Sequence, residues 1–264
     1  MSDAISDDAV LYELVGGAAV LTINRPKTLN ALDLPTLAAL EAAMVRAAAD
    51  PAAKAIVFTG AGRAFVAGGD IADLNSRQGL PHYLEFGERI HAVFRQVEAL
   101  DKPTIAAING WALGGGTELL LCTDLRIAAR SAMIGVPEIN LGLFPGAGGS
   151  QRLMRQVSPC KARELMFLGE RITADEAERI GLINSVVEDG EALNAALEIA
   201  VKLAAKSPMT LKLLKRVLRD GAEMPPAAAL AHEQAMIGLV LDSYDAHEGT
   251  AAFLAKRPAA FEGR

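Results

Sequence analysis

The sequence predicts an α/β layered core with parallel strands, followed by an all-helical C-terminal region. In the first part of the chain, short aliphatic β-rich runs alternate with glycine-rich loops and segments of helical periodicity, which is typical of such a core. From about Asp189 onward the strand pattern disappears and only helical segments remain. We therefore expect two regions, a core over residues 1–190 and a helical region over residues 191–264.

The predicted elements begin with a hairpin and a capped helix. Strands over residues 10–15 and 18–24 flank a Gly-Gly dipeptide, which readily adopts the positive φ of a tight turn. A helix is expected over residues 33–49, because Asp33 is a favoured N-cap and apolar residues follow at helical spacing. The later core elements are strands over 54–59, 104–108, 124–128 and 132–134, helices over 81–100 and 117–122 and from Ile71, and glycine-rich loops over 60–69, 114–116 and 145–149. In the tail, breaks are expected at Ser207-Pro208 and Met224-Pro225-Pro226.

Composition excludes several classes of protein. The 264 residues are 51% hydrophobic, which is too apolar for a disordered chain, and the surplus is aliphatic because only 5% are aromatic. The longest stretch without a charged residue has 15 residues, short of the about 20 that a membrane helix needs. The acidic first ten residues differ from a signal peptide, so a cytoplasmic location is expected. A net charge of −6 disfavours nucleic acid as a partner.

Neither a metal centre nor a nucleotide loop is predicted. Cys122 and Cys160 lie far apart in a chain without a CxxC motif, so buried thiols are expected instead of a zinc site or a disulfide framework. The loops GAGRAF and GAGGSQ place Phe65 and Gln151 where a dinucleotide fingerprint needs its third glycine. A Walker sequence is also absent. The glycine loops therefore either form simple turns or serve another site.

Gly115 and Glu118 have a spacing that suits catalysis. They lie three residues apart where GGG enters a helix, so a bare backbone N–H and a carboxylate can face one bound atom. The alternative is that Glu118 only complements the helix dipole.

Glu138 is a second candidate, since no other charged residue follows it before Arg152. An isolated carboxylate of this kind is either desolvated and reactive or bonded to backbone amides. Two carboxylates suit the addition of water, because one can accept a proton from water while the other delivers one to carbon.

Three long segments carry a family resemblance: IAAINGWALGGGTELLLCTDLRIA, PEINLGLFPGAGGSQRL and HEGTAAFLAKRPAAFEGR. Together they resemble the crotonase superfamily, and within it the enoyl-CoA hydratases, from the NRP at residues 24–26 onward. The resemblance implies a spiral of ββα repeats and a helical C-terminal region used in trimerisation. It also implies a homo-oligomer, either a trimer or a hexamer built from two trimers.

The resemblance also implies roles for individual residues. Glu118 and Glu138 match the two catalytic glutamates, and Gly69 and Gly115 match the residues whose N–H groups form the oxyanion hole. Gly146 matches a glycine that positions water. The positions implied to contact CoA or substrate are Arg25, Lys27, Ala67, Asp70, Ile71 and Lys256, the last of which would reach the site of a neighbouring subunit.

Two positions depart from the family pattern. Ala72 stands where many hydratases have a lysine, and Trp111 stands where tyrosine is more usual. Trp111 either shapes the acyl pocket or fills the core, and the core is the interpretation favoured from sequence. The acyl pocket is implied to use residues 74–84 and Phe144.

The function implied is reversible syn addition of water to a trans-2-enoyl-CoA, giving a 3-hydroxyacyl-CoA in fatty-acid β-oxidation. No metal and no cofactor are expected, because coenzyme A is part of the substrate. The nearest alternative is a Δ3-Δ2 enoyl-CoA isomerase of the same fold. An RNA-binding hydratase-like protein and a hydrolase using Ser150 are weaker alternatives, since the chain lacks a lysine-rich helix and a GxSxG motif. The aliphatic surplus in the tail is expected to pack against other subunits.

Overall fold

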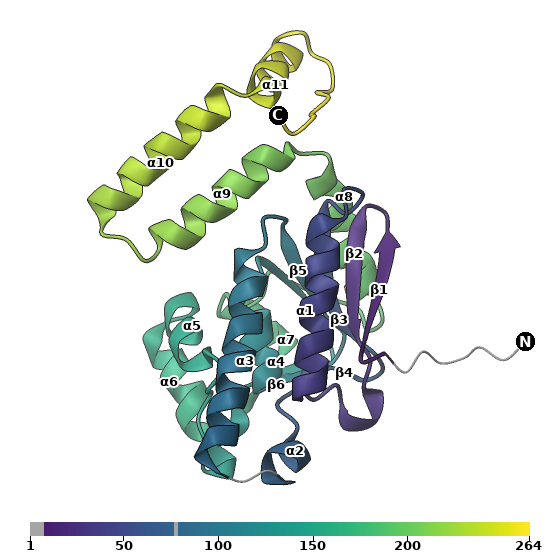
Figure 1. The fold of residues 1–264 in the computed structure, drawn as a ribbon, viewed down its shortest axis with the longest axis vertical. Helices are drawn as coiled ribbons and strands as arrows, with labels where there is room; N and C mark the ends of the chain where they lie inside the picture. The colour runs from purple at the N-terminus through teal and green to yellow at the C-terminus, as the bar shows by residue number, and fades with distance from the viewer. Residues whose placement is uncertain (1–7, 77–78) are drawn as a thin grey trace, which may run out of the picture.

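The structure is a computed structural model that describes residues 8–76 and 79–264 (Figure 1). Its strands are β1 (Val10–Val15), β2 (Ala18–Ile23), β3 (Ala55–Gly60), β4 (Ala64–Ala67), β5 (Thr104–Ile108), β6 (Trp111–Leu113), β7 (Leu125–Ala129), β8 (Met133–Gly135), β9 (Arg171–Thr173) and β10 (Ser185–Val187). Its α-helices are α1 (Leu34–Ala49), α2 (Ile71–Ser76), α3 (Leu80–Ala99), α4 (Gly115–Leu120), α5 (Gly149–Gln156), α6 (Pro159–Leu168), α7 (Ala174–Arg179), α8 (Ala192–Ala204), α9 (Pro208–Gly221), α10 (Pro226–Leu241) and α11 (Tyr244–Leu254). Two short 3₁₀ helices are η1 (Pro26–Thr28) and η2 (Pro137–Leu141).

The strands form two sheets that the chain visits in turn. The larger sheet has the order β1-β2-β3-β5-β7-β10, and the smaller has the order β4-β6-β8-β9. All neighbours are parallel except the hairpin pair β1 and β2 and the pair β8 and β9. Each of β3, β5 and β7 lies in the large sheet and is followed by a strand of the small one. This repetition confirms the predicted α/β class with its ββα turns.

In the small sheet only β8 matches a predicted strand, the one over residues 132–134, while β4, β6 and β9 escape sequence prediction. β4 and β6 lie within or beside segments read as glycine-rich loops, and they have four and three residues. Runs so short carry almost no periodicity, and their pairing partners are distant in sequence. No prediction covered residues 158–188, where α6, β9, α7 and β10 are found.

Both faces of the large sheet are buried. On one face Leu21 and Phe58 pack in the main core, whose helical wall includes residues of α1 and α3. On the other face Val20 and Val57 pack with Ala196 and Ala200 of α8, so neighbouring strand residues point to opposite faces. Since α8 covers the sheet, the first helix after residue 190 packs on the core. The predicted division at 190 and 191 itself stays a prediction.

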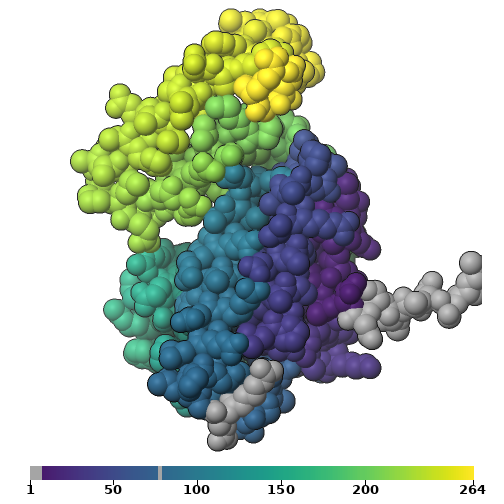
Figure 2. All heavy atoms as spheres, viewed as in Figure 1, coloured from purple at the N-terminus to yellow at the C-terminus, as the bar shows by residue number. Residues whose placement is uncertain are grey.

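The last three helices project from the core as an arm (Figure 2). Charged contacts tie α9 to the core: Lys215 lies 2.7 Å from Asp124, and Arg216 lies 2.8 Å from Asp101. α10 has no buried residue. Exposed apolar side chains of this arm include Leu230, Ile237, Leu241, Phe253 and Leu254. None of the helices in the described ranges is long and apolar enough to cross a membrane.

Candidate active site

Glu118 is placed by a short helix that is buried along its whole length. β6 ends at Leu113, and Gly114 then turns the chain with φ 51° into α4. The hydroxyl of Thr117 lies 2.7 Å from the carbonyl oxygen of Ala112 and 2.8 Å from that of Gly135, which anchors α4 to β6 and β8. Glu118 follows at once, and only 3% of its surface is exposed. Burying a carboxyl group so completely requires partners for it.

Those partners are backbone amides at the start of α5. Oε1 of Glu118 accepts hydrogen bonds from the N–H of Ala147 at 2.7 Å and from the N–H of Gly149 at 2.8 Å. A Cβ atom on Gly149 would lie 2.8 Å from Cγ of Glu118 and 2.9 Å from Oε1, too close for a side chain. Glycine at 149 therefore permits the approach that fixes the carboxyl group.

Burial raises the pKa of Glu118 from 4.5 to about 7, and the negative charge of Glu138 adds to this increase. The two amide hydrogen bonds and the positive charge of Arg152 act in the opposite direction. A carboxyl group with a pKa near neutral pH can both accept and release a proton under physiological conditions.

Glu138 lies on η2 and faces the same place. A Cβ atom on Gly114 would lie 2.8 Å from Oε1 of Glu138. The carbonyl oxygen of Gly114 accepts a hydrogen bond from the N–H of Glu118 at 2.9 Å. Oε2 of Glu138 is buried and has no hydrogen-bond partner among the described residues. Burial raises the pKa of Glu138 as well. The fold thus brings together two carboxyl groups that lie 20 residues apart in the chain.

Gly69 and Gly115 present two backbone N–H groups beside each other. In the parallel bridge of Leu32 with Gly69, the bonds use N–H of Leu32 and N–H of Asp70, which leaves the N–H of Gly69 pointing away from Leu32. Gly115 is the first residue of α4, where the N–H has no partner within the helix. A Cβ atom on Gly115 would lie 3.5 Å from N of Gly69. The two groups can therefore bind one oxygen atom.

Apolar side chains border this pair of amides. A Cβ atom on Gly69 would lie 3.6 Å from Cδ1 of Leu74 and 3.7 Å from Cζ of Phe86. Leu74 belongs to the segment implied to line an acyl pocket, although residues 77–78 of that segment lie outside the described residues. Phe144, also implied, is 72% exposed. An apolar wall beside a pair of N–H donors suits a carbonyl group that carries a hydrocarbon chain.

The sequence and fold have close relatives among known proteins. The family model for Enoyl-CoA hydratase/isomerase matches residues 13–264. The chain belongs to this family. A crotonyl-CoA hydratase of Syntrophomonas wolfei subsp. wolfei is 44% identical, covering 96% of this chain and 97% of the relative. A short-chain-enoyl-CoA hydratase of Clostridium acetobutylicum is 43% identical over 94% of this chain and 95% of its own.

A solved structure supports the same assignment. The enoyl-CoA hydratase of Bacillus anthracis superposes with a TM-score of 0.93 at 34% identity, covering 97% of this chain and 100% of the other. The resemblance inferred from the three sequence segments is therefore confirmed, and so is the predicted crotonase fold.

Within this enoyl-CoA hydratase/isomerase family member, two of the implied CoA contacts bind each other. Arg25 donates to Asp70 at 3.1 Å and lies 2.9 Å from Asp33. It also donates to the carbonyl oxygen of Ala31. Both carboxylates satisfy the guanidinium, so Arg25 braces the segment before α1 against the loop that carries Gly69. Its role as a phosphate contact stays a prediction.

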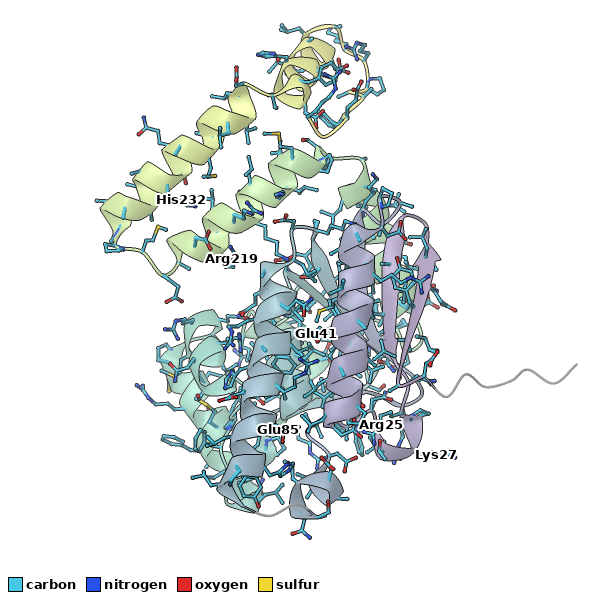
Figure 3. The ribbon with its side chains drawn as sticks, in the orientation of Figure 1. Arg25, Lys27, Glu41, Glu85, Arg219 and His232 are labelled. Atoms are coloured by element: carbon cyan, nitrogen blue, oxygen red, sulfur yellow. The ribbon has the colours of Figure 1, made fainter. Side chains whose placement is uncertain are left out.

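The other implied contacts are spread more widely. Ala67 ends β4, Ile71 begins α2 and is 50% exposed, and Lys27 is exposed on η1. Figure 3 places Lys27 near Arg25 at the lower end of the molecule. Lys256 follows α11, and Figure 1 places α11 at the opposite end from α2. Figure 1 also places α11 far from α4, which carries Glu118, so within one chain Lys256 lies remote from that glutamate. The contact that the resemblance implies would need a second copy of the chain.

Gly146 and Trp111 differ in how they relate to the site. Gly146 is exposed and directly precedes Ala147, whose N–H binds the carboxyl group of Glu118. Trp111 is only half-buried at the start of β6, with the guanidinium groups of Arg63 and Arg171 at 5.4 and 5.5 Å from its ring centroid. The favoured interpretation of Trp111 as a core residue is therefore wrong, because arginines stack on it at the surface.

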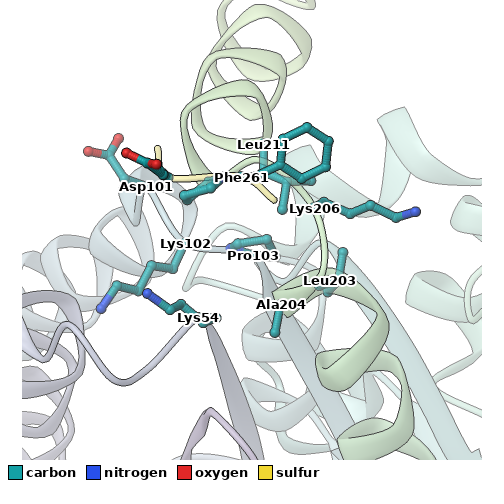
Figure 4. Close-up of a pocket in the computed structure, with 11 residues that line it drawn as sticks. Lys54, Asp101, Lys102, Pro103, Leu203, Ala204, Lys206, Leu211 and Phe261 are labelled. Carbon is teal, nitrogen blue, oxygen red and sulfur yellow. The ribbon is translucent and has the colours of Figure 1, made fainter. Parts of the chain in front are cut away.

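A cavity of about 110 Å³ lies elsewhere, between the core and the beginning of the arm (Figure 4). Lys54, Lys102 and Lys206 line it together with Asp101. Lys102 already donates to the carbonyl oxygens of Ala47 and Asp50 at the end of α1. Neither glutamate of the site lines this cavity, so it is separate from the candidate active site.

Sequence reasoning missed the residues that hold Glu118. Ala147 and Gly149 were recognised only as part of a glycine-rich loop, although a loop that leads into a helix signals free N–H groups. Glu98 was not singled out at all, and Arg152 served only to mark the next charge after Glu138. Glu98 and Arg152 hold this loop in place, because Arg152 binds Glu98 and also donates to the carbonyl oxygen of Ala147.

Proposed function

We propose that this protein is an enoyl-CoA hydratase that adds water reversibly and in syn fashion to trans-2-enoyl-CoA, giving a 3-hydroxyacyl-CoA. The observation that carries the proposal is the convergence of two carboxyl groups, that of the buried Glu118 and that of the half-buried Glu138, on the N–H pair of Gly69 and Gly115. The substrates are short-chain thioesters in fatty-acid metabolism, because relatives at 43 and 44% identity are a short-chain-enoyl-CoA hydratase and a crotonyl-CoA hydratase.

The arrangement assigns each group a step. The N–H groups of Gly69 and Gly115 bind the thioester oxygen and stabilise the negative charge that develops on it. Glu118 accepts a proton from a water molecule, whose oxygen bonds to the β-carbon, and the N–H of Gly146 helps to position this water. Glu138 delivers a proton to the α-carbon, so one water molecule is added overall. The reverse sequence dehydrates the 3-hydroxyacyl-CoA.

Two carboxyl groups favour hydration over double-bond isomerisation, which needs only one to move a proton between carbons. We expect crotonyl-CoA to lose its conjugated enoyl absorbance with the purified protein, and 3-hydroxybutyryl-CoA to form in equal amount. With a 3-enoyl-CoA, a hydratase gives little 2-enoyl product. Rapid formation of 2-enoyl-CoA before any hydroxy product, with slow hydration of crotonyl-CoA, would instead assign the isomerase reaction.

The reaction needs no metal and no cofactor beyond the coenzyme A of its substrate. A cytoplasmic location and the absence of a nucleic-acid partner stay predictions from composition, and a salt-dependent gel shift with RNA would overturn the second.

The protein assembles as a trimer or as two trimers. The arm supports this, because it exposes Phe253 to 82% and Leu254 to 81%, more than a monomer usually leaves in water. Light scattering should give about three or six times the chain mass of 27.7 kDa. Phe253→Glu should lower the mass, while Leu14→Glu, a control on β1 where Leu14 is 46% exposed, should not. A wild-type mass of one chain would contradict the assembly.

A further inference from the structure

Arg152 of α5 and Glu98 of α3 form a forked ion pair behind the candidate site. Nε of Arg152 lies 2.7 Å from Oε1 of Glu98, and Nη2 lies 2.7 Å from Oε2. Side chains of both residues are largely buried, with 15% of Arg152 and 30% of Glu98 exposed. Two parallel bonds fix the plane of the guanidinium group, which a single contact would not do. The pair therefore holds α5 at a set position against α3.

The third nitrogen of Arg152 reaches the loop that binds Glu118. Nη1 donates to the carbonyl oxygen of Ala147 at 3.0 Å. Gly148 wraps around the guanidinium group with φ 102°, and a Cβ atom there would lie 1.9 Å from Nη1. The N–H groups on either side of Gly148, those of Ala147 and Gly149, are the ones that bind Oε1 of Glu118. Hydrogen bonds on both sides of Ala147, joined by its backbone, thus connect Glu98 through Arg152 to Glu118.

We propose that Arg152, oriented by Glu98, is a positioning residue that holds the Ala147 and Gly149 amides in place and thereby fixes the carboxyl group of Glu118. The proposal rests on the hydratase function, in which Glu118 must face water and the β-carbon together. A displacement of about 1 Å in such a group can cost about 10²-fold in rate. Arg152 itself touches neither water nor substrate in this scheme.

The same pair also sets the charge around Glu118. The charged groups that act on it are Glu138 from η2 and Arg152 from α5, with Glu98 on α3 behind Arg152, and the thiol of Cys122, two residues after the end of α4, is a titratable group nearby. The charge of Arg152 lowers the pKa of Glu118, while that of Glu138 raises it. Removing the positive charge should raise the pKa of Glu118, and removing the negative charge of Glu98 should lower it.

Three variants separate position from charge. Arg152→Met should lower kcat for crotonyl-CoA about 10²-fold, leave KM within about threefold, and move the acidic limb of the kcat profile to higher pH. Arg152→Lys keeps the positive charge but cannot make both hydrogen bonds to Glu98. Its kcat should fall about 10-fold, while the acidic limb of its kcat profile stays at the wild-type pH. Glu98→Gln should lower kcat and move the limb to lower pH. A general loss of stability would not move the acidic limb in opposite directions in Arg152→Met and Glu98→Gln.

Arg179→Met is the matched control. Arg179 makes an equally forked pair with Glu176 on α7, with distances of 2.6 and 2.7 Å, but this pair lies at the surface. The kcat and the pH profile of Arg179→Met should match those of the wild type. If Arg152→Met retains kcat within threefold and keeps the wild-type limb, the positioning role is wrong.

A titration of the free protein keeps this test independent of the proposed reaction. Carbon-13 labelling of glutamate carboxyl groups, with the Glu118 signal identified by its loss in Glu118→Gln, measures the pKa of Glu118 directly. We expect a higher value in Arg152→Met and a lower value in Glu98→Gln. If the wild type fails to hydrate crotonyl-CoA but these shifts occur, the reaction is misassigned while the support of Glu118 stands. Unchanged values in both variants would overturn the support itself.

Discussion

Glu138→Gln should lower kcat for the hydration of crotonyl-CoA about 10²–10⁴-fold, which is the usual contribution of a general acid or base. Glutamine keeps the size of the side chain but cannot deliver a proton to the α-carbon. Because the Gly69 and Gly115 amides still bind the thioester oxygen, KM should change little. Steady-state kinetics at saturating and limiting substrate measure both quantities. Glu118→Gln should produce a loss of similar size, since an amide does not accept the proton of water.

Two controls separate lost chemistry from lost structure. Glu13→Gln, at an exposed position on β1, should retain wild-type kinetics. Because the folded-state pKa of Glu118 is raised from 4.5 to about 7, the unfolded chain ionises first, so stability is lost as the pH rises from about 4.5 to about 7 and stays lost above that range. Glu118→Gln should therefore melt at least as high as the wild type at pH 8. Rates of both glutamine variants within threefold of the wild type would refute the assignment of these two residues.

Gly116→Ala should destabilise the fold more than the other substitutions considered above. A Cβ atom at this position of α4 would lie 1.9 Å from the carbonyl oxygen of Val66 and 2.8 Å from its carbonyl carbon. The obstacle is the backbone of β4, which is paired to β6 and cannot move aside as a side chain could. We expect a loss of about 3 kcal/mol in the free energy of unfolding, as is typical of severe overpacking. The apparent melting temperature should fall by roughly 6–12 °C.

Gly87→Ala is the matched control for this variant. Gly87 lies within α3, and a Cβ atom there meets nothing within 4 Å. Since alanine is favoured over glycine in a helix by about 0.5–1 kcal/mol, this variant should melt at the wild-type temperature or slightly above it. Equal melting temperatures for the two variants would mean that α4 and β4 are not packed as described.

Sequence patterns predicted the long elements and the two glutamates for separate reasons. α1 and α3 are long enough for their apolar periodicity to be read, and Asp33 caps α1 as expected, accepting from the N–H of Thr36. Glu118 was identified from its spacing to Gly115 where GGG enters a helix, and Glu138 because it stands alone among apolar residues. The breaks near Pro208 and Pro226 separate α8, α9 and α10 as expected, because proline begins a helix readily but is poorly tolerated within one.

The remaining features depend on contacts between distant segments. The three-residue strand β6 owes its conformation to pairing with β4 and β8, which local sequence does not encode. The ion pair of Arg25 with Asp70 and that of Arg152 with Glu98 each join residues about 50 positions apart. For the same reason, sequence spacing alone could not establish that Glu118 and Glu138 face one place. The proximity of the two glutamates follows only from the contacts that Gly114 makes with both of them.

The most direct test of the account is a crystal structure with acetoacetyl-CoA, a 3-oxoacyl thioester that cannot be hydrated. The thioester oxygen should lie about 2.7–3.2 Å from both N of Gly69 and N of Gly115, as expected for hydrogen bonds. The α- and β-carbons should then lie between the carboxyl groups of Glu118 and Glu138. A thioester oxygen that contacts neither amide, with the acyl carbons remote from both glutamates, would contradict the proposed site.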